Sequence, residues 1–129
     1  MLLWGYPMDY TLAFFTGAAG YSLLEMLWRG YTHWTMSLAG GVCMLVIYCI
    51  NCAAPGVSVW IRCLAGAAVI TVTELVFGFG VNILLGWNVW DYSSLPLNFK
   101  GQICLLYSVL WYFLCFPITW ICTAISEYF

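Results

Sequence analysis

The stretch CLAGAAVITVTELVFGFGVNILLGW, residues 63–87, decides the fold of this chain. Its 25 residues are enough to cross a bilayer as a helix, which takes about 20 mostly apolar residues. The stretch carries a single charge, Glu74. An acidic group at the centre of a membrane helix costs roughly 2.5 to 3.5 kcal/mol on insertion scales, and residues kept at that cost usually have a function. Glu74 is therefore the first candidate for a functional residue.

The composition of the whole chain predicts an integral membrane protein. Apolar residues make up 65% of the 129 residues and charged residues only 6%, against about 25% in soluble proteins. The three basic residues are scattered, so they form no patch of the kind that nucleic acid requires. The length suits one domain, and we expect residues 1–129 to form a single integral membrane domain. The N-terminus does not resemble a cleaved signal peptide, so we expect the first helix to be retained.

Four apolar runs predict an all-α membrane fold with about four transmembrane helices. We place these spans at residues 10–28, 35–53, 57–82 and 103–126. Between the third and the fourth, residues 86–102 alternate aromatic and polar groups, which predicts an interfacial or re-entrant loop and not a fifth span. The spans are compatible with two helical hairpins. Small residues four apart, such as Ala13 and Gly17, would let neighbouring helices pack closely.

Polar residues with helical spacing mark the first span. Glu25, Arg29 and His33 follow one another at i, i+4 and i+8, so they would share one face if the helix continued past Gly30. Together they would form a proton or ion pathway, because a buried carboxylate can exchange protons near neutral pH. The alternative is that Arg29 neutralises Glu25 locally while His33 caps or anchors the following loop.

The third span repeats this spacing with Glu74, Gly78 and Asn82. Because this face is polar or small in an otherwise apolar helix, we expect it to look into the bundle, towards the first helix. If Glu25 and Glu74 meet, their like charges would favour one shared proton or a bound cation. The alternative is a pair of neutral acids that are hydrogen-bonded to the backbone.

The predicted pathway for a substrate or ion takes in polar residues of both spans and of the loop: Glu25, Arg29, His33, Glu74, Asn82, Asp91, Asn98 and Gln102. Aromatic residues of the loop would form a gate or the interface with water: Trp87, Trp90 and Tyr92. We assign no catalytic residue, expect no cofactor and leave the binding of a metal open. Haem is disfavoured because one His cannot supply two axial imidazoles.

Several motifs occur in an order that is similar to that of a known family. The segments around Arg29–Met36 and Thr73–Leu75, and above all GWNVWDYS at 86–93 with GQICL at 101–105, resemble the CmpB-like putative ABC-transporter permeases of type IV, a bacterial family. The resemblance covers roughly residues 20 to 112. Two positions depart from the family pattern, since Phe77 stands where Thr is usual and Leu106 where Pro is usual. The resemblance implies a permease-like subunit in the bacterial plasma membrane.

Three classes of function remain open from the sequence. The first is a small transport protein or channel for a cation, a proton-coupled solute or another small solute, acting as a homo-oligomer or within a larger transporter. The chain has no G-x-x-x-x-G-K-[ST] phosphate loop, so an ATPase would have to be a separate subunit. The second is a membrane enzyme, either a redox carrier using Cys49 and Cys52 or a lipid-modifying enzyme using His33 and Asp91. The third is a non-catalytic accessory membrane protein.

Overall fold

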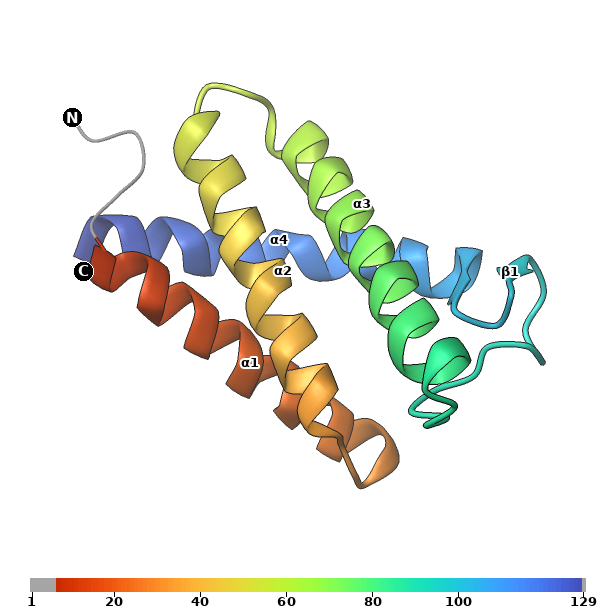
Figure 1. Cartoon of the computed structure of the whole chain (residues 1–129). Helices are drawn as coiled ribbons and strands as arrows, with labels where there is room; N and C mark the ends of the chain where they lie inside the picture. Colours follow the sequence, from red (N-terminus) through yellow and green to blue (C-terminus); the bar gives the residue numbers. More distant parts are fainter. Residues whose placement is uncertain (1–6, 129) are drawn as a thin grey trace.

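The chain folds as four long helices that are joined by short turns and one longer loop (Figure 1). This computed structural model describes the backbone of residues 7–128 and the side chains of residues 9–127. The elements are α1 (Pro7–Arg29), α2 (Trp34–Ala53), α3 (Val59–Phe77) with its π-helical continuation η1 (Gly78–Leu84), and α4 (Leu105–Tyr128). The boundaries predicted from the apolar runs agree with these within three residues, and the all-α fold class is confirmed.

Three of the described helices are long and apolar enough to cross a membrane: Trp34–Ala53, Val59–Leu84 and Leu105–Glu127. α1 has a comparable length of 23 residues. It is less apolar because it contains Asp9 and Glu25 together with several hydroxyl residues and glycines. The length and apolar composition of these helices show that the chain is a multi-pass membrane protein.

The helices pack as two hairpins, α1 along α2 and α3 against α4. In Figure 1, α4 crosses behind α2 and α3. The first hairpin is closed by glycines: a Cβ added at Gly17 would lie 2.2 Å from Cβ of Met44 and 2.4 Å from the carbonyl oxygen of Gly40. Lipid tails are as apolar as leucine, so membrane helices associate through such close packing and not through the hydrophobic effect.

The core lies where the two hairpins meet. One buried cluster joins all four helices: Ala13, Met44, Ile47, Tyr48, Cys63, Ile70, Cys115, Cys122 and Ile125. A smaller one joins α2 and η1 to the following loop: Met36, Val81, Val89 and Trp90. Large apolar side chains are exposed along the outside of the helices, as expected for surfaces that face lipid.

The α3–α4 loop, residues 85–104, contains no helix but does contain a small hairpin that the sequence did not predict. Its strands are β1 (Asn98–Phe99) and β2 (Ile103–Cys104), paired antiparallel with Asn98 opposite Cys104. The turn between them has positive φ at Lys100 (53°) and Gly101 (73°). The backbone polar groups of a non-helical segment need such local partners at a membrane surface. The predicted interfacial loop is thus present, with internal structure of its own.

Candidate functional site

Glu74 lies inside the bundle and is held by two aromatic donors. Its side chain extends from α3, where the residue is only 7% exposed. Nε1 of Trp111 on α4 donates a hydrogen bond to Oε1 at 2.8 Å, and the hydroxyl of Tyr92 in the loop donates to Oε2, also at 2.8 Å. The carboxylate therefore connects α3, α4 and the α3–α4 loop.

Glu74 has no basic partner among the described residues. The chain has three Lys and Arg side chains in total. Arg29 forms an ion pair with Glu25, Arg62 binds the side-chain oxygen of Asn51, and Lys100 lies over the ring of Phe79. The donors that Glu74 does have are neutral groups, so its charge is solvated but not neutralised. A carboxylate in this state tends to bind a proton or a cation.

Glu74 is among the residues that line a cavity of about 310 Å³, which we call the Glu74 cavity. All four helices and the loop contribute to its wall, and Glu74 is the only charged residue among those lining it. Three large aromatic side chains take part in the lining: Tyr21, Trp90 and Trp111. The cavity thus combines one acidic group with an apolar and aromatic surface.

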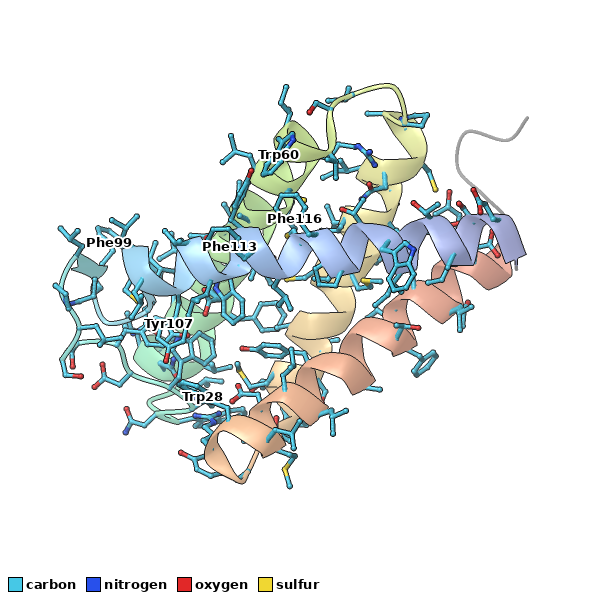
Figure 2. The ribbon with its side chains drawn as sticks, turned by 180° about the vertical axis from the view of Figure 1, so that it is seen from behind. Trp28, Trp60, Phe99, Tyr107, Phe113 and Phe116 are labelled. Carbon is cyan, nitrogen blue, oxygen red and sulfur yellow. The ribbon has the colours of Figure 1, made fainter. Side chains whose placement is uncertain are left out.

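A second cavity of about 290 Å³ adjoins the first, and we call it the Glu25 cavity. Its lining includes Glu25, Arg29 and Trp28, and also Tyr107 of α4. Figure 2 shows Trp28 and Tyr107 at the same end of the bundle, close to the loop. Six residues line both cavities: Tyr21, Leu24, Met36, Trp90, Trp111 and Leu114. The two cavities therefore adjoin, and each contains one of the two acids in its lining.

Glu25 and Glu74 are close enough to interact electrostatically, and each carboxylate has partners of its own. Glu25 is paired with Arg29, with 2.8 Å between Oε2 and Nε. This pair lies within one helix at i and i+4, where it forms without help from the rest of the fold. Glu25 and Glu74 belong to the linings of neighbouring cavities.

The polar ladder of the first span ends at Arg29. Gly30 adopts a positive φ of 79°, which ends α1, so His33 does not share a face with Glu25. His33 is instead the N-cap of α2, and its Nδ1 accepts a hydrogen bond from the backbone N of Thr35 at 3.2 Å. Its ring also lies 5.7 Å from that of Trp87, measured between centroids. His33 thus caps a helix and contacts the loop, the local alternative that the sequence left open.

Arg29 and Asn82 hold the loop on the bundle. Nη1 of Arg29 donates to the carbonyl oxygen of Val89 at 2.8 Å. The side-chain oxygen of Asn82 accepts from the backbone N of Val89 at 2.7 Å, and its amide donates to Oε1 of Gln102 at 2.8 Å. The backbone oxygen of Gln102 accepts from Nε1 of Trp90 at 3.0 Å. Asn82 and Gln102 are therefore occupied with one another and with the loop, and neither lines the two cavities.

Asp91 and Asn98 organise the loop internally. Oδ1 of Asp91 accepts from the backbone N of Ser93 at 2.9 Å, and this bond lowers the pKa of the Asp91 carboxyl below its usual value. The Asn98 amide donates to the carbonyl oxygen of Leu95 at 2.7 Å, and its oxygen accepts from the backbone N of Gly101 at 3.0 Å. Both residues lie outside the linings of the two cavities.

The sequence reasoning did not select Trp111, Tyr21 or Tyr107. Trp111 was overlooked because the fourth span contains no charge. A signal was nevertheless present, since a Trp N–H buried in a membrane helix needs an acceptor. Glu74, 37 residues earlier, supplies that acceptor.

The residues proposed for the enzymatic alternatives have separate surroundings. The seven cysteines, all in the described part of the chain, carry free thiols, including Cys49 and Cys52. His33 bonds to Thr35, whereas Asp91 bonds to Ser93 in the loop. The two enzymatic readings stay hypotheses.

A comparison with known families identifies the chain. The family described as putative ABC-transporter type IV matches residues 39–129, which takes in most of α2, all of α3, the loop and α4. The match contains Glu74, Tyr92 and Trp111, while Glu25 and Arg29 precede it. No curated protein and no solved structure matches the chain. Because the matched region is well over half of its length, the chain belongs to the putative ABC-transporter type IV family.

Proposed function

We propose that this chain is a single integral membrane domain that moves a small cationic solute across the membrane, with Glu74 as the group that binds the solute. One observation carries the proposal: Glu74, buried and without a basic partner among the described residues, belongs to the wall of a cavity between the helices. Such a group costs free energy in an apolar interior unless a proton or a cation joins it. Membership of a transporter family favours use of that group for transport.

Glu74 would alternate between a proton and the cation. Trp111 and Tyr92 donate to different oxygens, so the Trp111 bond would hold the side chain while the other oxygen exchanges its ligand. Exchange of the two ligands at one group is a route to proton-coupled transport. A channel would use the same residue as a binding site along a continuous pathway.

The α3–α4 loop would act as the gate of the site. Tyr92 and Trp90 come from this loop, and both reach the region around Glu74. Release of the Tyr92 hydroxyl from Glu74 would free one carboxylate oxygen and loosen the loop at the same step. Arg29 and Asn82 would keep the start of the loop attached while its centre moves.

The proposed setting is the bacterial plasma membrane, with the chain working as a homo-oligomer or as the permease-like subunit of a larger transporter. The chain has no phosphate loop, so energy from ATP would come through a separate ATPase subunit. Downhill movement of the solute needs no such partner. The proposed function therefore predicts measurable flux from the purified chain alone.

Flux into proteoliposomes tests the proposal. Liposomes containing the chain are expected to take up labelled monovalent cations, inorganic and organic, faster than empty liposomes, and Glu74→Gln is expected to abolish the difference. Glu127→Gln is the matched control, because it makes the same chemical change at an exposed residue of α4. Flux that is absent in the native chain, or equal in native and Glu74→Gln proteins, contradicts the proposal.

A further inference from the structure

We infer that the Glu74 cavity is a binding site for a small organic cation of the quaternary-ammonium class, held by the Glu74 carboxylate and by the rings of Tyr21, Trp90 and Trp111. The inference deepens the proposed function, on which it rests for the role of the site, by naming the class of solute. Three properties of the site support it: the charge and lining of the cavity, the hydrogen bonds that Glu74 already accepts, and the size of the cavity.

The charge and the lining of the cavity match such a cation. Glu74 supplies the only charge in the wall, and three aromatic rings take part in the lining. Aromatic rings attract cations within about 6 Å of the ring centroid, and recognition of quaternary ammonium groups by aromatic cages is the best-known use of this interaction. A neutral or anionic solute would leave the buried carboxylate without an opposite charge.

The hydrogen bonds of Glu74 disfavour a divalent metal ion. Oε1 and Oε2 each already accept one bond, from Trp111 and from Tyr92. Calcium takes six to eight oxygen ligands, and magnesium keeps a rigid octahedron of oxygens. Among the described residues, no group of three or more His, Cys, Asp and Glu side chains is placed to hold a metal ion. A quaternary ammonium group needs no acceptor at all, so it can share the carboxylate with both donors.

The size of the cavity limits the solute. Its volume of about 310 Å³ lies at the lower end of the range of about 300–1,000 Å³ that is typical of small-molecule pockets. The site therefore fits a compact cation with short substituents.

Binding of choline to the purified chain in detergent micelles tests the inference without any need for transport. Equilibrium dialysis with carbon-14 choline measures the affinity, and tetramethylammonium serves as a competitor. The neutral comparison is 3,3-dimethylbutan-1-ol, which has the shape of choline with carbon in place of the charged nitrogen. We expect saturable binding of choline, displacement by tetramethylammonium, and displacement by the neutral alcohol that is at least about tenfold weaker.

Variants locate the site. Glu74→Gln should weaken choline binding by at least about tenfold, whereas Glu127→Gln should leave it unchanged. Tyr21→Phe keeps the ring and should retain the affinity for choline. Tyr21→Leu removes the ring and should lower that affinity several-fold. Each variant is compared with the native chain in its melting temperature. The comparison of choline with the alcohol uses the native chain alone, so it stands even if a variant fails to fold.

The outcomes separate this inference from the proposed function. Three results overturn the inference. The native chain does not bind choline, the neutral alcohol displaces choline as well as tetramethylammonium does, or Glu25→Gln loses choline binding while Glu74→Gln retains it. Choline binding at Glu74 without any flux supports the inference and contradicts the proposed function. Flux of inorganic cations that depends on Glu74, in a chain that does not bind choline, supports the proposed function and overturns the inference.

Discussion

Replacement of Gly17 by Ala should force α1 and α2 apart. The added Cβ would lie 2.2 Å from Cβ of Met44 and 2.4 Å from the carbonyl oxygen of Gly40, whereas ordinary contact begins at 3.4 Å. Neither neighbour can yield, because one is a backbone atom and the other is fixed directly to the backbone of α2. The helices must therefore separate by about 1 Å along a contact that holds the first hairpin together.

The expected cost follows from two opposing effects. Forcing an extra methyl group into a packed interface typically costs about 1–3 kcal/mol. Replacing Gly by Ala within a helix favours folding by up to about 1 kcal/mol. Gly20→Ala separates these effects, because Gly20 lies on the same helix and a Cβ there would have no neighbour within 4 Å. Relative to Gly20→Ala, Gly17→Ala should lower the free energy of unfolding by about 1–3 kcal/mol.

Equilibrium unfolding in mixed micelles of dodecylmaltoside and SDS, followed by circular dichroism, measures both free energies. The comparison is made at equal detergent composition and protein concentration. The reasoning about close helix packing is refuted if the two variants are equally stable within about 0.5 kcal/mol, the usual scatter of such comparisons.

Two further predictions concern the loop. Gly78→Ala would place a Cβ 2.4 Å from Oε1 of Gln102, while a Cβ at Gly80 in the same π-helical segment would have no neighbour within 4 Å. Loss of the hydrogen bond from Asn82 to Gln102, worth about 1–3 kcal/mol, should speed cleavage of the loop by chymotrypsin roughly tenfold in the Gly78→Ala variant. Equal cleavage rates in the Gly78→Ala and Gly80→Ala variants would contradict this prediction. The hydrogen bond from the Ser93 amide lowers the pKa of Asp91 in the folded chain. The stability that this bond contributes is therefore complete above the pKa of Asp91 in the unfolded chain and is lost as pH falls through its pKa in the folded chain. Carbon-13 NMR should give a titration midpoint below about 3.9 for Asp91, and a midpoint at or above that value would show that the bond is absent.

Much of the fold was predictable because each helix is encoded by its own apolar run. Continuous apolar stretches of span length can satisfy their backbone polar groups in lipid only as helices, so the class and the approximate boundaries follow from local sequence. The widening of α3 into η1 was not predictable in this way. It begins at Gly78, where close packing of Gln102 depends on the loop that folds back over the helix.

Among the residues of the candidate site, contacts between near neighbours in the sequence were predictable, and contacts that depend on the tertiary fold were not. The pairing of Glu25 with Arg29 is a local i, i+4 contact, and the sequence contained it as one of two readings. The choice between those readings depended on Gly30, whose positive φ ends the helix before His33 can join the ladder. A glycine permits such a conformation but does not require it, so its spacing alone could not decide.

What the sequence by itself determined is that this chain crosses a membrane as helices and carries a carboxylate in the interior of its third long helix, because the cost of burying charge and unpaired backbone depends only on composition and spacing. What only the tertiary structure decided is the partners of that carboxylate. Tyr92 and Trp111 lie 18 and 37 residues away along the chain, and they reach Glu74 because α4 crosses α3 and the loop that joins them returns to the end of the bundle. Contacts at such separations depend on how helices pack, which the period of a single helix does not specify.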